Sequence, residues 1–92
     1  MELLSDEQIA QRLADSEWAR EGEAIVRDYK LADFAAAIAF VGEVAALAED
    51  ANHHPDILVH GWNKVRLRLS THSAGGVTDA DFALARRIDA LG

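Results

Sequence analysis

The alternation of residue types between positions 64 and 71 constrains the fold more than any other feature of this chain. Val65, Leu67, Leu69 and Thr71 alternate with lysine, arginine and serine side chains. Successive side chains of a β-strand point to opposite faces, so this period of two predicts a strand with one buried face and one wet face. We therefore expect a sheet with a core on one side and a basic, solvated surface on the other.

Capping residues predict helices before and after this strand. Ser5 and Gln8 have the spacing of a capping box, so a first helix should cover residues 6–14. Thr78 and Asp81 have a similar spacing and should open a last helix, whose apolar side chains can face inward. Spacing alone therefore gives Asp81 a structural reason to be acidic.

The second helix should be the longest. Asp33 is a suitable N-cap, and the helix should end near residue 51, because the residue before Pro55 is pushed out of the helical region. Apolar residues form a stripe along it at intervals of three or four: Phe34, Ile38, Val41, Ala45 and Ala48, widened by Phe40, Val44 and Leu47. This stripe predicts a helix that covers the sheet.

Three further strands complete the predicted order of elements. They are short and lie around Trp18, at residues 24–29 and at residues 57–59, and residues 60–63 should form the hairpin into the alternating strand. The order α-β-β-α-β-β-α predicts an α+β fold, with a four-stranded antiparallel sheet and its helices on one face. Residues 1–92 should form one domain, because two separate cores would be too small.

Composition argues against several classes of function. The net charge of −7 repels phosphate backbones and anionic membranes, so we expect no nucleic acid partner, and the basic run at residues 64–68 should be a solvated face. Without cysteine there is no disulfide or thiolate metal site. The acidic N-terminus offers no export signal, and no segment is apolar enough to span a membrane. We expect a cytoplasmic protein.

Three of the four histidines lie in two short segments at predicted element ends. His53 and His54 follow the second helix, and His72 follows the alternating strand. Adjacent histidines diverge on an extended chain and no second metal motif accompanies them, so we expect no metal site. A serine nucleophile beside His72 is disfavoured, because neighbours on a strand point to opposite faces. General acid and base catalysis is the remaining chemical function, since imidazole exchanges protons near neutral pH.

Each of these residues also has a structural interpretation. Glu49 precedes His53 by four positions and could orient a histidine, or be a solvated carboxylate at a helix end. Asp81 could likewise orient a histidine or only complete a helix cap. Pro55 could only end the helix, and His60 should be an ordinary surface residue. The residues alone leave catalytic and structural roles open.

A double histidine before Pro55, joined to a distant Thr71 and His72, is a specific combination in a chain this short. Further matching residues lie at 33–45, 48–49, 63–65 and 76–82. With these residues the chain resembles the pterin-4a-carbinolamine dehydratase family over nearly its entire length. The segment between Pro55 and Asn63 is one residue longer than in the familiar animal version, so its hairpin should be shaped differently.

The resemblance implies an α+β fold with a four-stranded antiparallel sheet and three helices on one side. It implies dehydration of 4a-hydroxytetrahydropterin to a quinonoid dihydropterin, in tetrahydrobiopterin recycling, without a cofactor or metal. The implied active-site residues are His53, His54 and His72, with Glu49 and Asp81 as acidic residues of the same pocket. The implied substrate contacts are Pro55, Thr71, Ser73 and Ala74.

Loss of water from such a substrate needs a proton donor and a proton acceptor. An imidazolium can protonate the leaving 4a-hydroxyl, while a neutral imidazole takes the proton from the ring nitrogen. We expect His53 and His72 to transfer protons and His54 to position the pterin. Glu49 or Asp81 should fix a histidine tautomer.

The alternative function is a non-catalytic interaction module on the same fold. Relatives serve as a dimerisation cofactor of a transcription factor or as an assembly chaperone of a carbon-fixing enzyme. Chaperone-type relatives are expected to lack the active-site histidines, whereas this chain has all three. In either case we expect a homodimer or homotetramer, because a short domain with a sheet covered on one side gains burial by self-association.

Overall fold

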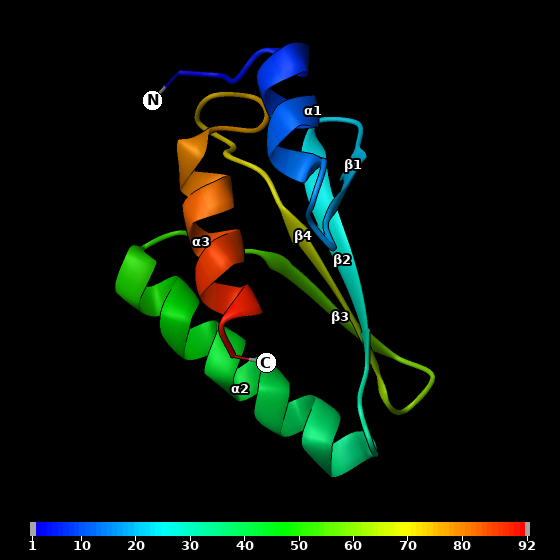
Figure 1. The fold of residues 1–92 in the computed structure, drawn as a ribbon. Coiled ribbons are helices and arrows are strands. Elements are labelled where there is room, and N and C mark those ends of the chain that lie inside the picture. Colours follow the sequence, from blue (N-terminus) through cyan, green and yellow to red (C-terminus); the bar gives the residue numbers. More distant parts are fainter. Residues whose placement is uncertain (1, 92) are drawn as a thin grey trace.

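The protein is an α+β fold with one antiparallel sheet, seen in a computed structural model that describes residues 2–91. The elements are α1 (Asp6–Leu13), β1 (Ala19–Glu21), β2 (Ala24–Lys30), α2 (Phe34–Ala51), β3 (Asp56–His60), β4 (Lys64–Leu69) and α3 (Asp79–Asp89). The strands pair in the order β1-β2-β4-β3, and the helices lie on one face of the sheet (Figure 1). The predicted fold class and element order are confirmed.

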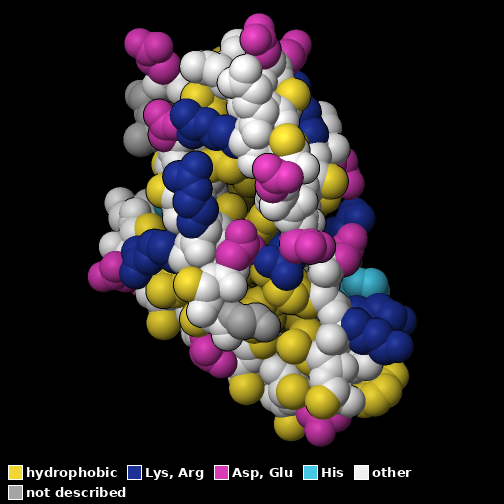
Figure 2. All heavy atoms as spheres, in the orientation of Figure 1, with side chains coloured by type: hydrophobic (Ala, Val, Ile, Leu, Met, Phe, Trp, Pro, Cys, Tyr) yellow, Lys and Arg dark blue, Asp and Glu magenta, His cyan; other side chains and the backbone are white. Residues whose placement is uncertain are grey.

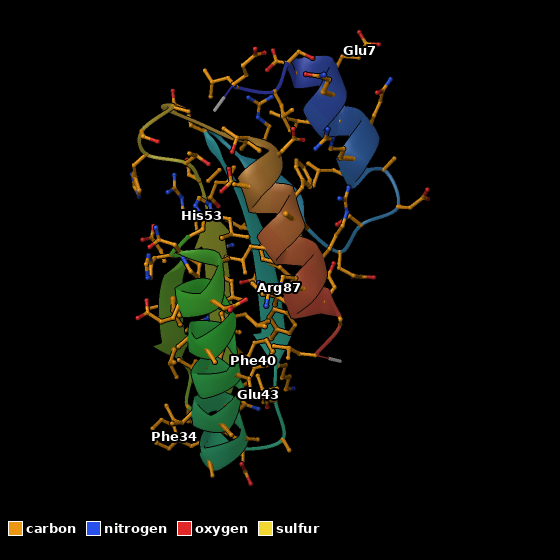
Figure 3. All side chains as sticks on the ribbon, turned by 90° about the vertical axis from the view of Figure 1, so that its left-hand side faces the viewer. Glu7, Phe34, Phe40, Glu43, His53 and Arg87 are labelled. Atoms are coloured by element: carbon orange, nitrogen blue, oxygen red, sulfur yellow. The ribbon has the colours of Figure 1, made fainter. Side chains whose placement is uncertain are left out.

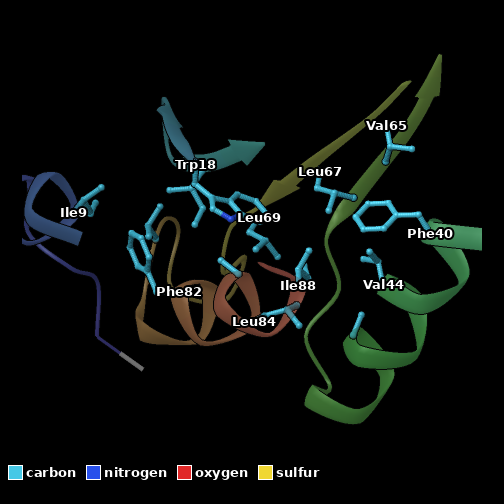
Figure 4. Close-up of a cluster of buried hydrophobic side chains, with 14 of the residues drawn as sticks. Ile9, Trp18, Phe40, Val44, Val65, Leu67, Leu69, Phe82, Leu84 and Ile88 are labelled. Carbon is cyan, nitrogen blue, oxygen red and sulfur yellow. The ribbon is translucent and has the colours of Figure 1, made fainter. Parts of the chain in front are cut away.

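The core follows from the period of two in β4. Val65, Leu67 and Leu69 are completely buried and point toward the helices, while the residues between them are exposed or half-buried. Around them gather side chains from all three helices and from β2, including Val44 of α2 and Ile88 of α3 (Figure 4). The predicted division of the sheet into a buried face and a wet face is therefore present.

Several strand ends differ from the sequence prediction by one or two residues, and two of these differences shape the loops that follow. Strand β4 ends at Leu69, not at residue 71, because the Thr71 backbone pairs with Gly76 inside the following loop, with Thr71 N donating to Gly76 O at 2.8 Å. Strand β3 extends to His60, which pairs with Lys64 and was predicted to lie in the hairpin. The hairpin turn is consequently shorter, and it contains Gly61 and Trp62, both with positive φ.

Helix α2 has two apolar sides, and the predicted stripe is divided between them. Phe40, Val44 and Ala48 are buried against the sheet and α3, as expected. Phe34 and Ile38 instead point outward and are 55% and 46% exposed (Figure 3 labels Phe34). No helix within residues 2–91 is long and apolar enough to cross a membrane.

Candidate active site

The C-terminus of α2 directs two histidines away from the helix. Asn52 caps the helix in the left-handed conformation (φ 50°, ψ 43°), which asparagine tolerates better than most residues. The His53 N–H donates to the carbonyl of Ala48 at 3.0 Å, which satisfies one of the last helical acceptors. The chain therefore leaves the helix sharply, and His53 lies at this end of α2 in Figure 3.

A buried carboxylate holds His53. Asp81 is completely buried, and its Oδ1 lies 2.6 Å from Nε2 of His53, whose side chain is 16% exposed. The other oxygen, Oδ2, accepts from the hydroxyl of Thr71 at 2.8 Å and from the N–H of Thr78 at 2.9 Å. A carboxylate only accepts, so Nε2 of His53 carries the hydrogen, and Nδ1 is the nitrogen left for other partners.

The same carboxylate also completes the cap of α3. The Thr78 side chain accepts from the N–H of Ala80, while Asp81 returns a bond to the Thr78 N–H, which is the capping-box arrangement. Because the Thr71 hydroxyl gives its hydrogen to Asp81, Thr71 accepts from the Thr78 hydroxyl at 2.7 Å. Asp81 is therefore both a helix cap and the partner of a histidine.

His54 has a different environment. Its Nε2 hydrogen bonds to Oε2 of Glu49, one turn back on α2, and both side chains are largely exposed at 60% and 75%. An exposed histidine–carboxylate contact of this kind contributes little to stability. The pair therefore fixes the direction of the imidazole at the rim of the site more than it stabilises the fold.

A tight turn after β4 presents His72. The Thr71 carbonyl accepts from the N–H groups of Ala74 and Gly75, at 3.0 and 2.9 Å, and Gly75 supplies the positive φ of 79° that this turn requires. His72 and Ser73 project from the turn and are exposed. No carboxylate within residues 2–91 lies within 4 Å of the His72 ring nitrogens.

One hollow of about 230 Å³ brings most of the predicted site residues together. It is lined by Asn52, His53, His54, Ser70, Thr71, His72 and Ser73. Asp81 lies behind His53, and Glu49 lies beside His54. Pro55 and Ala74, also predicted as substrate contacts, are half-buried but do not line the hollow.

Three residues at the site were not predicted to belong to it: Asn52, Ser70 and Thr78. Asn52 was assigned no role from the sequence, although an asparagine at a helix end is a signal for the left-handed conformation. Thr78 was expected only as a cap, and its hydroxyl also supports Thr71. Among residues 2–91, no three histidine or acidic side chains are arranged to hold a metal ion. Two of the three histidines, His53 and His54, instead each pair with one carboxylate.

Comparison with protein families identifies the chain. Residues 2–91 match the family model described as pterin 4 alpha carbinolamine dehydratase. The chain belongs to this family. Membership of the pterin 4 alpha carbinolamine dehydratase family agrees with the resemblance seen in the histidine pattern.

Similar proteins cover the chain almost completely. A protein from Chloroflexus aurantiacus, provisionally named pterin-4-alpha-carbinolamine dehydratase, is 54% identical over 99% of this chain and 98% of its own length. A protein with the same provisional name from Nocardia farcinica is 55% identical over 98% of this chain and 95% of its own.

Two solved structures share the fold of this pterin carbinolamine dehydratase family member. A transcriptional coactivator/pterin dehydratase from Brucella melitensis has a TM-score of 0.88 and 35% identity, over 96% of both chains. A pterin dehydratase-like protein described as a RuBisCO assembly factor in the alpha-carboxysome has a TM-score of 0.69 and 28% identity, over 84% of this chain and 90% of its own. The fold thus occurs both in a protein described as a coactivator/pterin dehydratase and in a protein described as an assembly factor.

The Thr78 hydroxyl gives a direct test of this network. We expect Thr78→Val, which keeps the shape but removes the hydroxyl, to lower the free energy of unfolding by about 1–3 kcal/mol, because a helix cap and a buried hydrogen bond are lost. It should also shift the His53 ring resonances, because Thr71 loses a partner beside Asp81. Urea denaturation and side-chain ¹H–¹⁵N spectra measure the two effects. Thr78→Ser is the control and should keep the wild-type His53 signals; unchanged His53 signals in Thr78→Val would contradict the network.

Proposed function

We propose that this protein is a lyase that dehydrates 4a-hydroxytetrahydropterin to quinonoid dihydropterin and water. The observation that carries the proposal is the convergence of His53, His54 and His72 on one hollow, with a buried carboxylate on His53. Family membership supports the same substrate class. Such a reaction needs two groups that exchange protons near neutral pH, and imidazoles are suited to both roles.

His53 is assigned as the proton acceptor. Its Nε2–H donates to Asp81, so Nδ1 can accept the proton from the pterin ring nitrogen as the C=N bond forms. The adjacent carboxylate then stabilises the imidazolium that results, as the aspartate does in a histidine–aspartate pair of a serine hydrolase. Asp81 is thus a positioning residue that acts through His53.

His72 is assigned as the proton donor. As the C4a–O bond breaks, the imidazolium of His72 protonates the leaving hydroxyl, so water departs and the electrons of the ring N–H bond form the C=N bond. The proton lost by His72 is balanced by the proton that His53 gains. His54, held by Glu49 at the rim, positions the pterin.

Substrate contacts are proposed for the residues that surround these histidines. Thr71 and Ser73 line the hollow and carry hydroxyl groups, although the Thr71 hydroxyl hydrogen is already given to Asp81. Pro55 and Ala74 do not line the hollow in this structure, so we propose for them only contacts with the outer part of the pterin, from the two loops that border it.

A stopped-flow measurement of 4a-hydroxytetrahydropterin breakdown near pH 7–8 tests the activity. The protein should accelerate the loss of water over buffer. His53→Ala and His72→Ala should each lower kcat on the order of 10²-fold or more, the usual effect of losing a general acid or base. No acceleration by the wild type would refute the dehydratase and favour the alternative, a non-catalytic interaction module on the same fold.

The role of Asp81 is tested against its neighbour Asp79, which lies on the same turn of α3 but is 68% exposed. We expect Asp81→Asn to lower kcat on the order of tenfold or more, because the amide no longer fixes His53 in one tautomer. Asp79→Asn should keep the wild-type rate. The pH–rate profile should change only in Asp81→Asn, whereas equal rates and profiles in both variants would remove Asp81 from the site.

We also propose that the protein self-associates through the outward side of α2. Phe34 and Ile38 are exposed there, and the residues that continue this side are small: Ala35, Ala39, Gly42, Ala45 and Ala46. Gly42 lies at the middle of the helix, and nothing within 4 Å occupies the space beside its Cα. If α2 of a second protomer packs antiparallel across Gly42, both helices present the same apolar surface, and their small residues allow the two backbones to approach closely.

Light scattering coupled to size-exclusion chromatography tests this interface. The wild type should be a dimer or tetramer at micromolar concentration, and Ile38→Glu should shift it to the monomer, because the interface would bury an unpaired charge. Leu3→Glu is the control, since Leu3 is similarly exposed at 53% but its side chain lies beside Gly76, and it should keep the wild-type mass. A monomeric wild type would contradict the proposal.

A further inference from the structure

Both lysines of the chain lie opposite one another on the uncovered face of the sheet. Lys30 of β2 and Lys64 of β4 are directly paired in the ladder, and His60 of β3 pairs with Lys64 on the other side. Their neighbours Tyr29, Val65 and Val59 point toward the helices, so these three side chains point the other way. Three strands therefore contribute one row of nitrogen-bearing side chains.

This row is electrostatically unfavourable in the isolated chain. Like charges directly opposite on an antiparallel pair are destabilising. The arginines on the same face are neutralised, since Arg66 pairs with Asp28 at 2.9 Å and Arg68 with Asp56 at 3.5 Å. Within residues 2–91, neither lysine has a carboxylate oxygen within 4 Å, although the chain has a net charge of −7. The sequence predicted a solvated basic face here, and only its arginines have partners.

The lysines border a hollow with a volume of about 500 Å³. Leu58, which is 54% exposed, provides an apolar wall, and His60 lies at the end near the hairpin. Asp28 is the only carboxylate in the lining, and its hydrogen bond with Arg66 holds the pKa of Asp28 below its usual range. Lysine or arginine side chains and a histidine gather where this hairpin projects (Figure 2). The hollow has the size of a small-molecule site and a surplus of positive charge.

We propose that this hollow binds the phosphate group of a small molecule, between the ammonium groups of Lys30 and Lys64. A phosphate monoester carries a charge of about −1.5 to −2 at pH 7, which matches two unpaired ammonium groups. Lysine binds phosphate as a point charge without fixed geometry, and Leu58 can contact the apolar part of the ligand. A polyanion is disfavoured, because the whole molecule is strongly acidic.

This site is separate from the histidine hollow. Lys64 begins β4, and Thr71 lies seven positions later, which corresponds to roughly 23 Å along an extended chain. The two hollows share no lining residue. Phosphate binding is therefore independent of the dehydratase proposal, and either can fail alone.

An NMR titration at constant ionic strength tests the site, with phenyl phosphate, inorganic phosphate and acetate as probes. We expect phenyl phosphate to shift the amide signals of Lys30, Leu58 and Lys64 saturably, and to bind more tightly than acetate. The double variant Lys30→Gln/Lys64→Gln should weaken its binding about tenfold or more. Arg86→Gln is the control, because Arg86 also lacks a carboxylate within 4 Å among the described residues but lies on α3, and it should bind like the wild type.

Stability separates loss of binding from loss of folding. Removal of two opposed charges should leave the midpoint of urea denaturation of the double variant equal to or above that of the wild type. Absence of saturable shifts, or equal binding by wild type and double variant, would overturn the proposal. Equal affinity for phenyl phosphate and acetate would overturn the assignment of a phosphate group. Tighter binding of a short single-stranded DNA at the same amides would overturn the small-molecule ligand and indicate a polyanion.

Discussion

The buried carboxylate of Asp81 is the interaction on which the rest of this structure depends. An ionised group without water is stable only if its lone pairs are satisfied, and here a histidine, a hydroxyl and a backbone N–H satisfy them. These donors come from the end of α2, the end of β4 and the start of α3. One carboxylate therefore fixes the relative position of three chain segments. The proposed catalytic geometry follows from the hydrogen bonds that these segments make to Asp81.

Because helices cover only one face of the sheet, the uncovered face of the sheet and the outward side of α2 differ in character. The helices bury the apolar face of the sheet. The opposite face is exposed to solvent and carries the arginine–carboxylate pairs Arg66–Asp28 and Arg68–Asp56. Helix α2, in contrast, is apolar on both sides, because one side meets the sheet and the other carries Phe34 and Ile38. The proposed protein contact and the proposed phosphate site thus lie on surfaces of opposite character.

Local patterns predicted the fold well, and they predicted the site only in part. The period of two in β4 and the capping residues at Ser5, Asp33 and Thr78 depend on neighbours in sequence, and each is found in the structure. The buried side of α2 was only partly predictable, because an alanine-rich helix with apolar residues on two sides has no single preferred face. That face is set by packing with elements far away in the sequence.

The double role of Asp81 was not predictable for a related reason. Spacing identified a helix cap and the resemblance identified an acidic residue of a pocket, but only the docking of α3 beside α2 shows one carboxylate with both partners. The pairing of Lys30 with Lys64 likewise depends on the register of β2 and β4. Both contacts join residues that are far apart in the sequence, so they depend on the tertiary structure and no local pattern predicts them.

The separation of His53 from Asp81 by 28 positions has a consequence for biosynthesis. At roughly 5–20 residues per second, a ribosome adds the aspartate about 1–6 s after the histidine. During that interval the nascent chain carries an imidazole without the partner that orients it, and the end of α2 is without its contact to α3. The histidine site is therefore among the last parts of the molecule to acquire its final geometry.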